Sequence, residues 1–399
     1  MPVPQVCPPV PPRATSDGGI ITSSAAVVDG NVYFGAGKTL YSLRASDGYL
    51  NWKTVICGKP GKGCETDEND PTRIFSSPVV SGDTIFIGHT ADSAAGYSGG
   101  FEAVQAVDAP HAAKGTVLWR FDTDPGGNNR GCGSVWSSAA VDPDLHLVYF
   151  GTGDCGQDAP PPYHEAIIAL DTAGPDTVTG RPKWVFRPRA TDTCDFDFGA
   201  SPNIIDFGVN GHYVGLGGKD GTYYLLDRRS GARIWATRVV FGGSIGGFFG
   251  GAAFDGTHIF SSTAVGDFQP KSPTKVCTVP PAPGDTLHQD PSMHALNVAN
   301  GSRYWKRPFN YSFGATTLAN GVVFSGSLVL PSLNAYVASG PLHGLLLKAF
   351  VLKDKTTGIT GQVNSAAVPV GRMLFVTTGN IADGSSGGVH AFALPAWVP

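Results

Sequence analysis

The sequence predicts an all-β protein, a β-propeller built from four-stranded blades that each end on a tryptophan. A tryptophan-ended phrase recurs along the chain, and a short phrase rich in serine and alanine precedes each copy. The composition agrees, because 54 glycines and 31 prolines with only 15% charged residues suit short strands joined by tight turns and disfavour helices. Seven repeats can be counted.

The first copy shows the recurring unit most clearly. Residues 32–35 and 40–43 read as strands, with β-branched or aromatic residues as in 32–34, the turn Ser46-Asp47-Gly48 follows, and Trp52 ends the unit. Five of the seven tryptophans end such a unit, namely Trp52, Trp119, Trp184, Trp235 and Trp305. The preceding short phrases begin at Ser23, Ser76, Ser137, Ala200, Gly250, Ala315 and Ser365. We therefore expect small residues on the inner strands and tryptophan on an outer strand, packed between neighbouring sheets.

A β-sandwich or a solenoid is the alternative, but its period is shorter and it does not require a tryptophan at one place in each copy. The sixth and seventh units lack that tryptophan. Since a closing blade often takes a strand from the other terminus, residues 10–28 are predicted to supply one. Residues 1–19 are then an N-terminal extension, and residues 20–399 form a single propeller domain.

Charge and cysteine usage limit the function classes. A net charge of −4 and a pI near 6.2 give no sign of the basic surface that binds nucleic acid. No apolar run is long enough to span a membrane as a helix. Seven cysteines indicate an oxidising compartment, and Cys57 with Cys64 and Cys132 with Cys155 are predicted disulfides. We expect a secreted or periplasmic protein, with no signal peptide in the chain as given.

Four stretches resemble the propellers that bind pyrroloquinoline quinone (PQQ), most of all the polyvinyl-alcohol-dehydrogenase-like quinoproteins. These are 136–142 with 148–154, 195–202, 217–227, and 242–247 with 255–256. The resemblance implies a quinoprotein that oxidises an alcohol, small or polymeric, with PQQ and Ca²⁺ in the central channel. It also implies an electron-acceptor protein as partner.

The resemblance assigns one role to each of four residues. Asp197 would be the base that removes the alcohol proton, and Asp154 a Ca²⁺ ligand. Trp136 would be the ring on which the cofactor stacks, and Lys219 a partner for its oxygens. Asp195 is interpreted as structural.

The sequence departs from the family at several points, and one of them is that a tryptophan expected near Gly250 is missing. The family has eight blades, and it has asparagine where this chain has Asp154. Its metal-binding glutamate in the second unit has no clear counterpart, because only Asp92 and Glu102 lie near that place.

Each site residue also has a plain structural interpretation. The two aspartates of 195–197 would cap turns, Asp154 would be a turn residue, Trp136 would fill the channel wall, and Lys219 would lie in a solvated hairpin. The alternative function is therefore a non-catalytic propeller scaffold that binds protein or polymer after loss of the cofactor. A third is hydrolysis or lyase chemistry on the same face.

Overall fold

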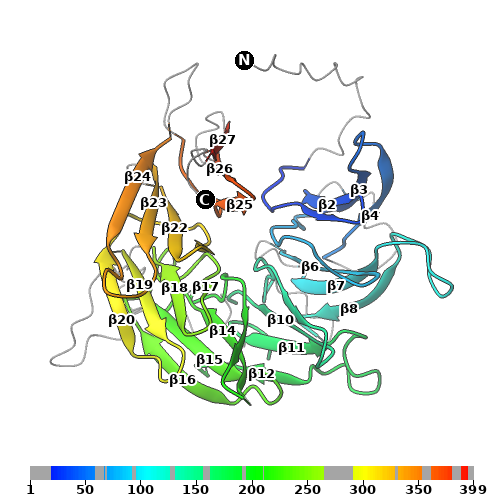
Figure 1. Ribbon diagram of the computed structural model, residues 1–399. Helices are drawn as coiled ribbons and strands as arrows, with labels where there is room; N and C mark the ends of the chain where they lie inside the picture. Colours follow the sequence, from blue (N-terminus) through cyan, green and yellow to red (C-terminus); the bar gives the residue numbers. More distant parts are fainter. Residues whose placement is uncertain are drawn as a thin grey trace.

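The fold is a series of seven antiparallel sheets that follow one another around a ring in chain order (Figure 1). The computed structural model describes residues 19–58, 67, 70–91, 96–125, 131–155, 162–190, 195–209, 211–264, 291–328, 331–352, 361–379 and 388–393. Six sheets have four strands and the seventh has three. The predicted seven-bladed propeller is confirmed.

The strands of the blades have the following bounds. Blades one and two contain β1 (Ala26–Val28), β2 (Asn31–Ala36), β3 (Thr39–Arg44), β4 (Leu50–Val55), β5 (Val79–Ser81), β6 (Thr84–His89), β7 (Gly100–Gln105) and β8 (Val117–Asp122). Blades three and four contain β9 (Ala140–Asp142), β10 (Leu147–Gly151), β11 (Ile167–Asp171), β12 (Trp184–Phe186), β13 (Asn203–Phe207), β14 (Gly211–Gly217), β15 (Thr222–Asp227) and β16 (Arg233–Arg238). Blades five to seven contain β17 (Ala253–Phe254), β18 (His258–Ser262), β19 (Ser292–Asn297), β20 (Arg303–Pro308), β21 (Thr317–Ala319), β22 (Val322–Ser327), β23 (Ser332–Val337), β24 (Leu346–Val351), β25 (Val368–Val370), β26 (Met373–Thr378) and β27 (Gly388–Ala393).

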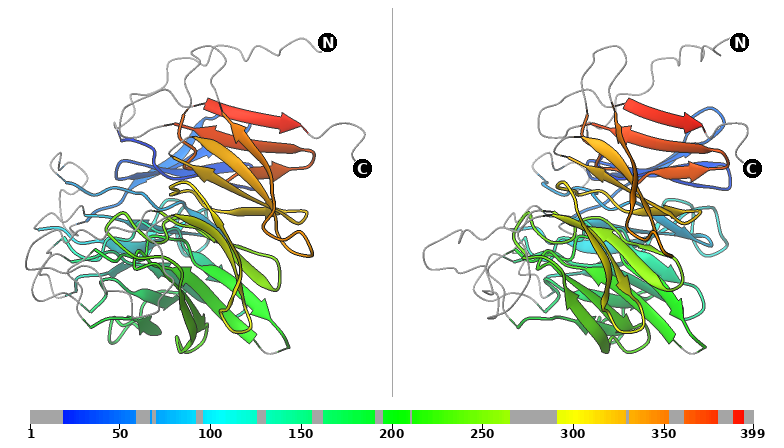
Figure 2. Two further views of the ribbon diagram at one scale, coloured as in Figure 1. Left: turned by 90° about the vertical axis from the view of Figure 1, so that its left-hand side faces the viewer. Right: turned by 60° about the vertical axis from the view of Figure 1, so that its left-hand side comes forward.

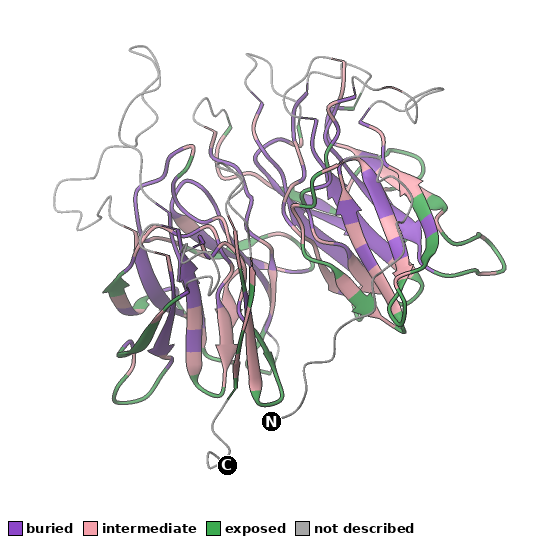
Figure 3. Cartoon of the chain, turned by 90° about the horizontal axis from the view of Figure 1, so that it is seen from above, coloured by how far each residue is buried: buried purple, intermediate pink, exposed green. Residues whose placement is uncertain are grey.

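The first strand of each blade is the innermost, because the first strands of successive blades from one to six lie against one another. Each short serine- and alanine-rich phrase of the sequence ends just before such a strand. The recurring tryptophans lie on the fourth, outermost strand of blades one to five. Buried residues run through the sheets and exposed residues lie mainly at the turns (Figure 3).

One hydrogen bond recurs at the five junctions that have a tryptophan. Each indole N–H donates to the backbone carbonyl of the residue that follows the third strand of the next blade. The pairs are Trp52 with Ala106 (3.1 Å), Trp119 with Thr172 (3.1 Å), Trp184 with Arg228 (3.0 Å), Trp235 with Val298 (2.7 Å) and Trp305 with Ala338 (2.9 Å). The tryptophans thus join neighbouring sheets, as predicted.

The junction between blades three and four shows why glycine is needed beside the indole. Gly231 has a φ of 72°, and a Cβ at this position would lie 2.7 Å from the ring of Trp184. The ring of Trp184 also packs on Tyr149, with centroids 5.7 Å apart. Since these two blades carry the site described below, this indole fixes one sheet against the other where the site forms.

Replacing Trp184 with phenylalanine should lower the free energy of unfolding by about 1–3 kcal/mol. The change removes the indole N–H that pairs with the Arg228 carbonyl and leaves a gap at the junction. Urea unfolding followed by circular dichroism measures the loss. Val185→Ala, on the next residue of β12 and more exposed, is the control and should change stability by less than about 0.5 kcal/mol. Equal losses in the two variants would contradict a special role for the indole.

The predicted closing strand is wrong for the residues that the structure describes. Strand β1 pairs with β2 and is the inner strand of blade one, so residues 26–28 do not join the last sheet. The amide of Gly37 bonds the carbonyl of Ile20, which holds residue 20 against blade one as well. Residues 10–18 lie outside the described part. Figures 1 and 2 place the three-stranded seventh blade after the sixth, at the end of the series.

One predicted disulfide is confirmed. Cys132 and Cys155 are bonded, with their Cα atoms 4.6 Å apart. Cys57 is also disulfide-bonded, but Cys64 lies outside the described residues, so that pairing stays a prediction. Within the described ranges no helix is long and apolar enough to cross a membrane.

Candidate active site

Two blades, three and four, bring the four predicted site residues together. Trp136 precedes β9, Asp154 follows β10, Asp197 precedes β13, and Lys219 lies in the turn between β14 and β15. Asp197 is the centre of the group. Its Oδ1 accepts a hydrogen bond from the Asp154 backbone N–H at 2.7 Å. Its Oδ2 accepts from Trp136 Nε1 at 3.2 Å and from Lys219 Nζ at 2.7 Å.

Backbone contacts hold Asp197 in this position. The Phe198 amide donates to the Thr152 carbonyl at 3.1 Å, and the Lys219 amide donates to the Asp197 carbonyl at 2.9 Å. These bonds tie the loop that carries Asp197 to both blades. The side chains of Asp197 and Lys219 are almost fully buried. The geometry of the pair is therefore fixed by the sheets and not by a free loop.

Gly199 allows the loop to pass beneath the indole of Trp136. A Cβ at Gly199 would lie 1.7 Å from the Cη2 of Trp136, so a side chain here would displace the ring. Gly199, in the stretch 195–202 that resembles the family, thus has a packing role. It lets the backbone approach the ring closely enough for the indole N–H to reach Asp197.

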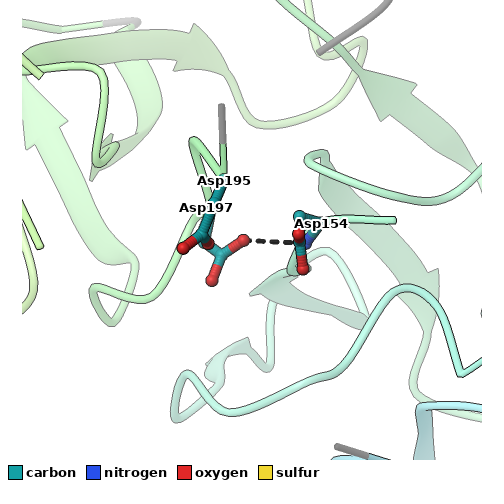
Figure 4. A group of neighbouring side chains, drawn as sticks. All are labelled: Asp154, Asp195 and Asp197. Atoms are coloured by element: carbon teal, nitrogen blue, oxygen red, sulfur yellow. Dashed lines mark hydrogen bonds between the residues drawn. The ribbon is translucent and has the colours of Figure 1, made fainter. Parts of the chain in front are cut away.

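Asp195 also belongs to the site, although the sequence analysis interpreted it as structural. Its Oδ1 lies 2.7 Å from Lys219 Nζ, so one ammonium bridges two carboxylates. Figure 4 shows Asp195 beside Asp197, whose carboxylate is joined to the Asp154 backbone by a dashed line. One oxygen from each of the three aspartates lies within 4.8 Å of the others. Asp195 has a φ of 60°, and this backbone turn, which the sequence does not reveal, brings it to Lys219.

Burial and charge shift the proton affinities of the central pair. Burial raises the pKa of Asp197 to about 7; Lys219 opposes this rise, and the charges of Asp195 and Asp154 add to it. Burial disfavours the charged form of Lys219, but Asp197 and Asp195 outweigh it, so the pKa of Lys219 is raised. A buried carboxyl with a pKa of about 7 can accept and release a proton at neutral pH.

Aromatic rings surround the ammonium. Lys219 Nζ lies 5.4 Å from the ring centroid of Trp136 and 5.5 Å from that of Phe249. Phe249 lies 5.8 Å from Trp136 and 4.3 Å from Phe313. Sequence reasoning missed both phenylalanines. Phe249 directly precedes Gly250, near which the family has a tryptophan, so that position was the available signal.

Of the two residues considered as the missing metal-binding glutamate, Glu102 is described by the structure and does not join the site. Glu102 is buried in β7, where its carboxylate contacts His89 Nδ1 at 3.1 Å and Arg120 Nε at 3.8 Å. It is absent from the group of three aspartates within the described residues. Asp92 lies outside the described part of the chain. The acidic group therefore comes from blades three and four alone.

Known proteins similar to this chain share its fold and repeat. Residues 23–240 match the family model described as the β-propeller domain of glucose, ethanol and alcohol dehydrogenases, named for PQQ. A polyvinylalcohol dehydrogenase from Pseudomonas sp. is 25% identical over 339 residues, which cover 73% of this chain and 48% of that protein.

Two solved structures superpose on the propeller. A europium-containing methanol dehydrogenase does so with a TM-score of 0.65 and 16% identity, over 89% of this chain and 72% of that one. BamB from Moraxella catarrhalis gives a TM-score of 0.56 and 15% identity, over 94% of this chain and 86% of that one. At these identities both show the fold alone. This chain spans about half of the polyvinylalcohol dehydrogenase that it matches.

Proposed function

Because the chain belongs to the β-propeller family of glucose, ethanol and alcohol dehydrogenases, we propose that it is a quinoprotein dehydrogenase that oxidises an alcohol, small or polymeric, with PQQ. One observation carries the proposal. Asp197 is a buried carboxylate held by three donors, with a pKa near neutrality, beside an aromatic ring and two further aspartates. Those are the features that a base needs for removing a hydroxyl proton.

The residues present fit the two groups that such a reaction requires. Asp154, Asp195 and Asp197 offer carboxylate oxygens within 4.8 Å of one another, and hard oxygen ligands are those that Ca²⁺ prefers. Lys219 already places one positive charge beside two of these carboxylates. Trp136 and Phe249 would flank the flat ring system of PQQ, and Lys219 would contact its oxygens.

The chain's own side chains would then divide the work. Asp197 accepts the proton of the substrate hydroxyl, while Trp136 and Lys219 hold its Oδ2 in one orientation. When bound, PQQ supplies the hydride acceptor that no side chain can provide. Asp154 and Asp195 would hold the Ca²⁺ beside Asp197. The burial of Asp197 excludes water from the proton that it takes up.

A titration tests the proposal. Purified protein is titrated with PQQ in the presence of Ca²⁺, and absorbance and tryptophan fluorescence are followed, because Trp136 should be quenched by a bound quinone. Alcohols of increasing size are then assayed with a dye as electron acceptor. We expect saturable binding at micromolar PQQ and dye reduction that depends on both additions. Absence of saturable binding would refute the enzyme function.

A non-catalytic scaffold is the second candidate, and one observation favours it. Trp136, Lys219 and the Asp154 amide already satisfy Asp197, so the group is complete without a cofactor. In that case neither PQQ nor Ca²⁺ would change the fluorescence or the Tm. Hydrolysis or lyase chemistry, the third possibility, has no comparable observation in its favour.

Location and partner follow from the same proposal. The Cys132–Cys155 disulfide supports an oxidising compartment, so we place the protein outside the cytoplasm, secreted or periplasmic. An alcohol oxidised by a quinone leaves two electrons to be removed. We therefore propose a soluble electron-acceptor protein as its partner.

A further inference from the structure

The junction between blades six and seven differs from the five before it. In blade five Trp305 pairs across the sheet with Ala295, and the register shifts directly afterwards. In blade six the residue at this place is Lys348, which pairs with Ala335 and has the same register shift after it. Blades one, two and four repeat the tryptophan arrangement of blade five. Lys348 therefore occupies the position of the missing tryptophan.

The ring that this tryptophan would cover is left partly exposed. The ring of Trp305 packs 5.9 Å from that of Phe260 on the second strand, and Phe260 is fully buried. Phe324 has the equivalent place in β22, because both phenylalanines pair with the alanine that faces the tryptophan position. Phe324 is only half-buried. The lysine thus leaves partly exposed a ring whose equivalent, Phe260, is covered by Trp305 at the junction of blades five and six.

A cavity of about 480 Å³ lies at this place between blades six and seven. Its walls are mainly apolar, with Phe324 and Phe350 from blade six and Leu374 and Phe392 from blade seven. Lys348 is exposed and lines the cavity. The size falls in the range of about 300–1,000 Å³ that is usual for small-molecule sites. The site is far along the ring from the aspartates of blades three and four (Figure 1).

We propose that this junction cavity binds a small aromatic anion. Its three phenylalanines and its width suit a flat ring, which would occupy the space that an indole fills at the other junctions. The positive charge of the cavity wall favours a negatively charged substituent on the ring. Lys348 and Arg372 line the cavity, and no aspartate or glutamate does so among the described residues. A carboxylate or sulfonate on the ring would lie beside Lys348.

Ligand-observed NMR on the full chain tests the proposal with three probes that share one ring. Indole-3-acetate carries a negative charge, indole is neutral, and tryptamine carries a positive charge. We expect affinities in that order, on the order of 1 mM for indole-3-acetate. The step from indole-3-acetate to indole should be about fivefold, as one exposed charge pair provides. Equal affinity for indole-3-acetate and tryptamine would overturn the assignment.

Two kinds of variant locate the site. Lys348→Trp and, from the opposite wall, Leu374→Trp should each abolish binding by filling the cavity, and Lys348→Trp should also raise the Tm. Lys348→Met keeps the cavity and should lower the affinity for indole-3-acetate to that for indole. Binding that survives both filled variants refutes the site. A wild-type dimer that Lys348→Trp makes monomeric would assign the cavity to a second copy of the chain and overturn the proposal.

Discussion

Replacing Asp197 with asparagine should lower the rate of alcohol oxidation by about a thousandfold. Asparagine has the same shape but cannot accept the substrate proton, and general-base catalysis contributes about 10²–10⁴ in rate. Its single amide oxygen can still accept from Trp136 and Lys219, so the loop should keep its position. We therefore expect PQQ to bind with nearly unchanged affinity. Steady-state dye reduction measures the rate, and fluorescence titration measures the binding.

Asp195→Asn is the matched control for this experiment. The two aspartates lie two residues apart and share the ammonium of Lys219, but only Asp197 accepts from Trp136 and from the Asp154 amide. Loss of Asp195 should weaken Ca²⁺ binding and leave most of the turnover at saturating metal. A result with the two variants exchanged would assign the base to Asp195. Equal, small effects would remove both from the reaction.

The sequence was sufficient for the blades, and the reason is physical. A tryptophan at one place in five of the seven repeats, in most of them shortly after a turn such as Asp-Gly or Ser-Gly, is informative because each indole must reach the same carbonyl of the next blade. The recurring tryptophan is visible in the sequence because the same contact between neighbouring blades recurs in the fold. The closing strand could not be predicted in this way, because strand pairing between chain ends leaves no periodic signal. The N-terminal strand β1 pairs within its own blade.

The candidate site was partly predictable for a similar reason. Asp154, Asp197, Lys219 and Trp136 lie in phrases attached to the repeat, and the fold brings them into hydrogen-bonding contact. The contact of Asp195 with Lys219 had no signal in the sequence, because it depends on a left-handed backbone conformation at Asp195. Phe249 reaches the site from the segment before blade five, and the packing of blade five against blade four brings its ring to Lys219. Contacts between separate blades are set by packing, which single-sequence patterns do not contain.

Replacing Lys219 with methionine should lower the free energy of unfolding by about 3–5 kcal/mol at neutral pH. The ammonium contacts both Asp195 and Asp197 at 2.7 Å, and its removal leaves buried carboxylates without a cation. The loss should depend on pH. Burial holds the pKa of Asp197 above its unfolded value, so its stabilising contribution is present in acid and is lost as pH rises through the folded pKa. Because the variant raises that pKa further, it should be least stable, relative to wild type, in alkali.

Thermal unfolding at about pH 5.5 and about pH 8.5 measures this difference, and Ca²⁺ distinguishes its causes. If the three aspartates form a metal site, millimolar Ca²⁺ should restore most of the stability of Lys219→Met, because the metal replaces the lost positive charge. Lys114→Met is the control, since its pair with Asp108 is exposed to solvent and should contribute little to stability. Similar losses in the two variants would show that the Lys219 bridge is no stronger than a surface pair. A large loss that Ca²⁺ leaves unchanged would separate the stabilising role of the lysine from metal binding, and would favour the scaffold over the enzyme.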